Sequence, residues 1–150
     1  MWGMIISIIS GILMSVQGVF NTEVTEATNI WITAAFVQLT AFIVCIGAWF
    51  VTGRESSLIQ VINFRPLYML SGGIIGAFIT YTVVSGMDIL GPAKAVMFIV
   101  TAQIVAAYLI ELFGMFGVEK TTFHWSKLIG LILMITGIIV FKWQSKGASH

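Results

Sequence analysis

The chain alternates between long apolar segments and short polar connections. Five apolar segments lie at about residues 2–24, 30–51, 66–87, 93–113 and 127–143. Each is too long for a β-strand, whereas a helix of about 20 residues, rising roughly 1.5 Å per residue, crosses a bilayer core of about 30 Å. The first segment lacks a basic leading region and a small-residue cleavage site, so we expect a span there and not a signal peptide. The pattern predicts an all-α integral membrane protein, a single domain over residues 1–150 with five transmembrane helices.

Composition supports this interpretation and excludes several classes of function. Hydrophobic residues make up 59% of the chain and charged residues only 9%, whereas soluble domains carry about 25% charge. The net charge of +1 provides no basic surface for nucleic acid. The single cysteine, Cys45, cannot form an intrachain disulfide, and we expect a small buried hydrophobe there. No catalytic motif, nucleotide loop or metal-ligand spacing is present, so we expect neither an enzyme, nor a cofactor, nor a metal site.

Polar side chains interrupt two of the apolar segments in a helical pattern. Gln17 and Asn21 are spaced i, i+4 in the first segment, and Gln103 and Glu111 are spaced i, i+8 in the fourth, so each pair shares one helix face. Polar groups at membrane depth are costly and usually face a partner or a water-filled cavity. We predict that these four residues bind a substrate.

Each pair also has a purely structural alternative. Gln17 and Asn21 could form hydrogen bonds to a neighbouring helix and act as a clasp. Glu111 lies near the end of its helix, where the helix dipole disfavours a carboxylate, and it could simply pair with Lys127 or Lys120.

Glycines and capping residues predict where helices pack and where they end. Small residues allow close approach of helices in lipid, and the predicted packing positions are Gly11, Gly72, Gly73, Gly76, Gly130 and Gly137. Asn29 is a good N-cap for the second helix. Gly91 and Pro92 suit the start of the fourth helix, because proline at the first helical position lacks an N–H that would be unpaired anyway. Gly114 is expected to follow its end.

The positive charges are distributed almost evenly across the two predicted sides of the membrane. The side that holds the N-terminus would carry Arg54, Arg65, Lys120 and Lys127, and the other side Lys94, Lys142 and Lys146. Orientation normally follows a clear excess of Lys and Arg on the cytoplasmic side. Without such an excess, we expect dual topology and an antiparallel homodimer, or pairing with a homologous chain of opposite orientation, as in inverted-repeat transporters.

The order and spacing of these motifs resemble a known family. The motifs are Gly11-x(5)-Gln17-x(3)-Asn21, Gly72-Gly73-x-x-Gly76, Gly91 with Gln103, Glu111-x-Phe113-Gly114-x-Phe116-Gly117 and Lys127-x-x-Gly130-x(6)-Gly137. Together they resemble the YdcZ-like short family of the drug/metabolite transporter superfamily, a domain of unknown function. The resemblance covers nearly the whole chain. It implies a multi-pass protein of a bacterial or archaeal cytoplasmic membrane, with five spans that form one half-unit of a ten-span transporter fold.

The resemblance favours transport, with two departures from the family pattern. Glu111-Leu112 stand where the family often has Asp-His, so an acid–His relay does not carry over, and Lys127 replaces the usual Arg. We therefore expect a secondary transporter of a small polar or cationic solute. Classical proton-coupled cation antiport is less expected, because the neutral amide of Gln17 stands in the region where superfamily cation exporters often place an acid. The alternative is a non-transport membrane module that serves assembly or binds lipid or another small molecule.

Overall fold

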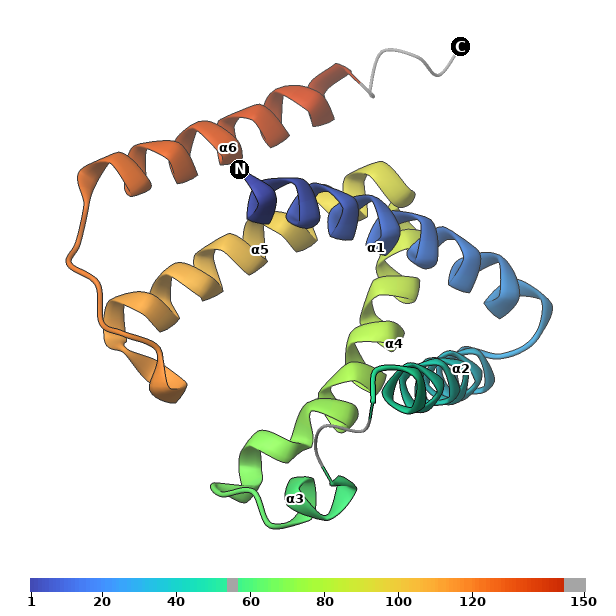
Figure 1. Ribbon diagram of the computed structural model, residues 1–150. Helices are drawn as coiled ribbons and strands as arrows, with labels where there is room; N and C mark the ends of the chain where they lie inside the picture. The colour runs from blue at the N-terminus through green and yellow to red at the C-terminus, as the bar shows by residue number, and fades with distance from the viewer. Residues whose placement is uncertain (54–56, 145–150) are drawn as a thin grey trace. The chain divides into compact units, whose positions relative to one another are not determined.

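The computed structural model describes residues 1–53 and 57–144, and the described part of the chain is all helical (Figure 1). Of the positive charges in the topology prediction, Arg54 and Lys146 lie outside these residues. Within the described residues, four helices are long and apolar enough to cross a membrane by length and composition. A shorter apolar helical stretch covers Trp125–Phe141. The predicted all-helical membrane fold is thus confirmed at this level.

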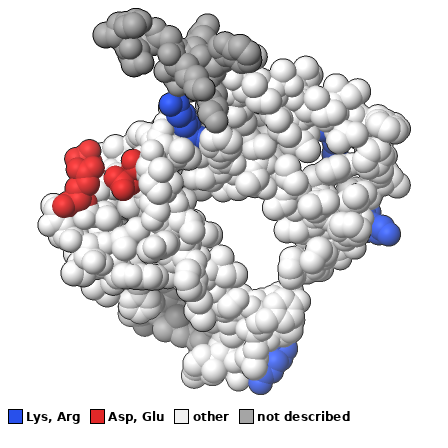
Figure 2. Space-filling model, turned by 180° about the vertical axis from the view of Figure 1, so that it is seen from behind, with Lys and Arg blue, Asp and Glu red and all other residues white. Residues whose placement is uncertain are grey.

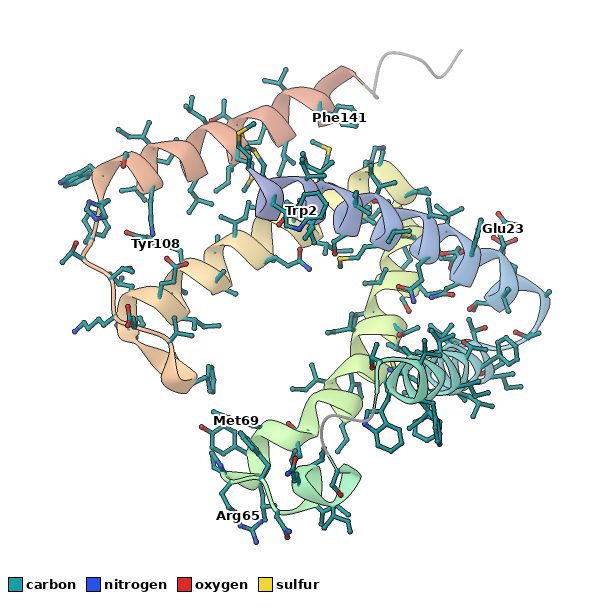
Figure 3. The ribbon with its side chains drawn as sticks, in the orientation of Figure 1. Trp2, Glu23, Arg65, Met69, Tyr108 and Phe141 are labelled. Atoms are coloured by element: carbon teal, nitrogen blue, oxygen red, sulfur yellow. The ribbon has the colours of Figure 1, made fainter. Side chains whose placement is uncertain are left out.

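The chain divides into two units, Met1–Ile89 and Leu90–His150, and each is described by itself. The first unit contains three long helices and two short ones. They are α1 (Trp2–Ala27), α2 (Ile30–Val51), α3 (Leu58–Ile62), the 3₁₀ helix η1 (Leu67–Ser71) and α4 (Gly72–Leu90). Arg65 and Met69 mark the segment around η1 in Figure 3. The second unit contains α5 (Pro92–Phe113), the 3₁₀ helix η2 (Met115–Gly117) and α6 (Trp125–Gln144).

The helices of the first unit meet at a small core. Gly18 on α1 is buried, and an added Cβ there would lie 2.7 Å from the sulfur of Met87 on α4. On α2, Thr33 and Ala34 are 2% and 3% exposed, while Val84 on α4 is 1% exposed. Absence of a side chain at position 18 therefore allows α4 to approach the backbone of α1.

A second contact joins α2 to α4. The rings of Trp31 and Tyr81 stack with centroids 4.9 Å apart. Further along the two helices, an added Cβ at Gly76 would lie 2.8 Å from Nε2 of Gln38. Gly76 thus leaves room for the Gln38 amide directly against the α4 backbone.

The second unit is a helical hairpin whose connection depends on left-handed backbone. Gly114 ends α5 with φ 65° and ψ 42°, and its N–H donates to the carbonyl of Ile110. An added Cβ at Gly114 would also lie 3.1 Å from Cβ of Lys120. Glycine meets both demands, because it adopts positive φ without penalty and needs no space for a side chain. The turn brings the start of α6 back alongside the end of α5 (Figure 1).

Most side chains of the long helices are exposed in the single chain. The exposed group includes large apolar residues on every one of these helices, such as Ile9, Phe42, Ile79, Leu109 and Leu133. Figure 2 shows the same character on one face, where charged residues are few: two acidic groups lie next to each other and the basic groups lie apart. A protein whose helices expose this much hydrocarbon is suited to a lipid environment and not to water.

Candidate functional site

A groove between α1 and α2 contains one of the predicted residue pairs. Its volume is about 530 Å³, within the usual range of about 300–1,000 Å³ for small-molecule sites. The lining residues are Gln17, Asn21, Val24, Thr33, Phe36, Val37, Thr40, Ala41, Val44 and Cys45. The two helices diverge from their short connection, and α2 is seen nearly end-on in Figure 1.

The two amides of this groove have free hydrogen-bonding capacity. Gln17 is exposed and Asn21 half-buried. Within residues 1–53 and 57–144, neither side chain forms a hydrogen bond to another residue. Because an amide can both donate and accept, the pair presents four N–H donors and two carbonyl oxygens to whatever enters the groove. The alternative, a clasp to a neighbouring helix, is not formed among the residues that the structure describes.

Threonine hydroxyls connect the helix ends beside the groove. The hydroxyl of Thr25 donates to Oγ1 of Thr33 at 3.0 Å, and Thr33 in turn donates to the carbonyl of Asn29 at 3.1 Å. The hydroxyl of Thr28 donates to the carbonyl of Val24 at 2.7 Å. Asn29 itself caps α2 by accepting the N–H of Trp31 at 2.8 Å. The predicted N-cap is confirmed, and the Thr25–Thr33 bond joins the end of α1 to the start of α2.

The structure places Cys45 differently from the sequence-based expectation. Its side chain is exposed and lines the groove with Gln17 and Asn21. The expectation of a buried cysteine was wrong, because a position inside an apolar run can face lipid or a groove as easily as a protein core. As the only cysteine of the chain, it provides a chemical probe within the groove.

The other two predicted residues belong to the second unit. Gln103 on α5 is exposed and lines neither of the grooves described here. Glu111 lines a groove of about 370 Å³ between α5 and α6. The lining residues are Ile104, Ala107, Tyr108, Glu111, Lys127, Gly130, Leu131 and Met134. The structure therefore brings Gln17 and Asn21 together in one groove and places Glu111 in another.

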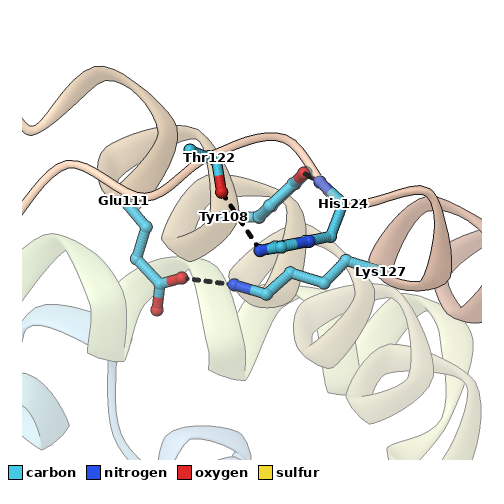
Figure 4. Close-up of polar contacts among 5 residues, drawn as sticks. All are labelled: Tyr108, Glu111, Thr122, His124 and Lys127. Carbon is cyan, nitrogen blue, oxygen red and sulfur yellow. Dashed lines mark hydrogen bonds and ion pairs between the residues drawn. The ribbon is translucent and has the colours of Figure 1, made fainter.

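A polar cluster closes one end of the α5–α6 groove (Figure 4). The Glu111 carboxylate accepts a hydrogen bond from the Lys127 ammonium at 2.8 Å, with these side chains 42% and 43% exposed. Nζ of Lys127 lies 5.1 Å from the centroid of the Tyr108 ring. The Tyr108 hydroxyl accepts the backbone N–H of His124 at 3.3 Å, and the His124 ring contacts the Thr122 hydroxyl at 3.2 Å. The sequence allowed either Lys127 or Lys120 as the partner of Glu111, and in the structure the partner is Lys127.

The predicted packing glycines differ in what surrounds them. Gly76 faces Gln38 closely, as described above. At the other predicted positions an added Cβ would meet nothing within 4 Å, namely Gly11, Gly72, Gly73, Gly130 and Gly137. Helix packing at these open positions stays a prediction. Gly18, where an added Cβ would clash with Met87, was not among the predicted packing positions, although it approximately extends the small-residue stripe of α1.

The described residues contain no group of three or more His, Cys, Asp or Glu side chains that could hold a metal ion. The groove of the first unit offers two amides for hydrogen bonding. The groove of the second unit offers one ion pair beside an aromatic ring.

Comparison with known proteins identifies the family. No curated protein and no solved structure matches the chain. The profile of the family described as "Putative inner membrane exporter, YdcZ" matches residues 2–140, which is most of the chain and includes both grooves. The chain therefore belongs to the YdcZ family of the drug/metabolite transporter superfamily.

Proposed function

We propose that this protein is a secondary transporter of a small polar or cationic solute, and that the α1–α2 groove contributes its binding site. The observation that carries the proposal is the pair of unpartnered amides, Gln17 and Asn21, in one open groove. The family description adds export across the inner membrane. An amide without partners in hydrocarbon costs several kcal/mol, roughly 4–8 on a cyclohexane scale, and a hydrated solute in the groove removes that cost.

The chemistry of the groove limits the solutes and the coupling that we propose. Its lining contains amides and hydroxyls but no acid or base. Recognition would therefore depend on hydrogen bonds and on amide oxygens directed at a cation. A neutral amide does not exchange protons, so these residues alone would not couple transport to a proton gradient. Gln103 and Glu111 remain predicted solute contacts that a complete transporter would add to the groove.

We further propose that the two units form one five-span domain, and that two chains of opposite orientation make the transporter. The almost even distribution of Lys and Arg supports dual topology. An antiparallel pair of five-span chains would reproduce the two halves of a ten-span transporter, with alternating access by rocking about a shared site. The exposed apolar faces and the five open glycines offer surfaces for such an assembly.

The native cysteine allows a direct test of the groove. We would measure the rate at which a maleimide alkylates Cys45 in membranes, with and without each of a panel of small polar and cationic solutes. A solute that binds the groove should slow the reaction, and Gln17→Leu should abolish this protection while folding and dimerisation stay nearly intact. In a matched control, Cys45→Ser with Ser126→Cys, the new thiol lies at the exposed start of α6 and should not be protected.

The results separate the proposal from its alternatives. If no transported solute protects Cys45, or if Gln17→Leu transports and is protected like the wild type, the groove is not the solute site. If Gln17→Leu aggregates while the wild type does not, the amide is a structural clasp. If reconstituted vesicles show no solute flux in either direction with any member of the panel, the non-transport membrane module is favoured.

A further inference from the structure

We propose that the α5–α6 groove binds a zwitterionic phospholipid of the surrounding bilayer, with the headgroup at Glu111 and Lys127 and an acyl chain along the groove. This assignment does not involve Gln17 and Asn21 of the α1–α2 groove, but it competes with the predicted role of Glu111 as a solute contact. If it holds, Glu111 contacts lipid and not the transported solute.

The groove has the two-part character of a site for an amphiphile. Its walls are formed by hydrocarbon side chains and small residues: Ile104, Ala107, Gly130, Leu131 and Met134. The groove has open space at Gly130, where an added Cβ would meet nothing within 4 Å. All of the charge lies at one end, where Glu111 and Lys127 are less than one turn from the ends of their helices. An acyl chain would lie along the apolar walls of the groove, and a charged headgroup would lie at its charged end.

The polar end is complementary to a headgroup that carries both signs of charge. Glu111 and Lys127 are 2.8 Å apart and each is more than 40% exposed, so both keep unused hydrogen-bonding positions. Lys127 can take a phosphate as a cationic donor. Glu111 can accept hydrogen bonds from a primary ammonium, and the nearby Tyr108 ring attracts cations. A phosphoethanolamine headgroup supplies both partners, whereas phosphatidylglycerol supplies only the anion.

Aromatic residues place this end of the hairpin at the level of lipid headgroups. The Phe123 ring lies 6.5 Å from that of Tyr108 and 5.4 Å from that of Trp125. Figure 3 shows Tyr108 on α5 near the connection to α6. Tyrosine and tryptophan concentrate at the membrane–water interface, because their rings are apolar and their edges polar. A ligand at this level that also places an acyl chain along the apolar walls comes from the bilayer, which is why we assign a lipid and not a free zwitterion.

Native mass spectrometry of the purified full-length protein tests the assignment. Titration with phosphatidylethanolamine and with phosphatidylglycerol of the same acyl chains should show a preference of about tenfold for the former. Glu111→Gln should remove the preference, and Lys127→Gln should weaken retention of both lipids. The connecting segment supplies matched controls, since Glu119 and Lys120 are exposed and form no ion pair within the part of the chain that the structure describes. Glu119→Gln and Lys120→Gln should behave like the wild type.

A second variant tests the apolar part of the groove without changing a charge. Gly130→Leu places a side chain into open space and should reduce retention of both lipids several-fold. The same spectra report the oligomeric state, and circular dichroism reports whether each variant is folded. Equal retention of the two lipids by the wild type would overturn the proposal. So would equal effects of Glu111→Gln and Glu119→Gln, or displacement of the lipid by glycerophosphoethanolamine at equal concentration, because the last result would identify a soluble zwitterion as the ligand.

Discussion

Substitution of Gly76 by alanine tests the α2–α4 contact directly. The added Cβ would lie 2.8 Å from Nε2 of Gln38, about 0.7 Å inside an ordinary contact of about 3.5 Å. Gln38 is half-buried, so it must leave its rotamer or shift, at a cost of about 1–2 kcal/mol. Alanine also stabilises a helix by about 0.5–1 kcal/mol relative to glycine. We expect Gly76→Ala to range from neutral to destabilising by about 1.5 kcal/mol.

A matched control separates the contact from helix propensity. Gly47 on α2 has no atom within 4 Å of an added Cβ, so Gly47→Ala should stabilise the protein by the propensity gain alone. Removing the opposing amide of Gln38 should remove the steric cost of Gly76→Ala. In a Gln38→Ala background, we expect Gly76→Ala to stabilise about as much as Gly47→Ala, which corresponds to a coupling of about 1–2 kcal/mol.

The assay is equilibrium unfolding in mixed micelles, with the fraction of SDS as denaturant and circular dichroism as the signal. All four combinations at positions 38 and 76 are measured together with Gly47→Ala. If Gly76→Ala stabilises the wild type as much as Gly47→Ala does, the close approach of Gln38 to α4 is wrong. The same conclusion follows if the two substitutions at 38 and 76 are additive. Gly76→Leu, which adds a larger side chain, should disrupt the contact completely.

Three further predictions concern other parts of the chain. Reporter fusions to the C-terminus should register on both sides of the membrane, and a signal from one side only would refute dual topology. Glu111→Gln should lower the free energy of unfolding by no more than about 1 kcal/mol, since the pair with Lys127 is more than 40% exposed. An effect above about 2 kcal/mol in the same SDS titration would show that the pair is a structural link. Thr33→Val should destabilise the first unit by about 1–2 kcal/mol, because it deprives the Thr25 hydroxyl of its acceptor. An unchanged free energy of unfolding would show that the hydroxyl cluster does not stabilise the first unit.

Local features were predictable from the sequence because their causes are local. The capping bond of Asn29, the start of α5 at Gly91 and Pro92, and its end at Gly114 were all predicted and are confirmed. Each depends on the conformational preference of one or two residues. The apolar length of the segments likewise fixed the four long helices.

Contacts between helices were not predictable, because they depend on how the helices cross. In the sequence, Gly11 and Gly18 look alike, yet only Gly18 has a neighbouring side chain that an added Cβ would meet. The partner of Gly76 proved to be the polar Gln38, which a pattern of small residues does not indicate. The role of the four predicted binding residues stays a prediction, although the structure now groups Gln17 with Asn21 and Glu111 with Lys127.

The two-residue connection between α1 and α2 affects how the protein is made. Only Thr28 and Asn29 separate these helices, and hydroxyl bonds tie the two ends together, so no exposed loop is available to cross the membrane separately. The pair would enter the bilayer as one hairpin. No Lys or Arg precedes Arg54 in the sequence, so a newly made hairpin carries no basic side chain to choose its side. Its orientation would then be decided only after residue 54 leaves the ribosome, so that, if the proposed dual topology holds, synthesis is the step at which the two orientations separate.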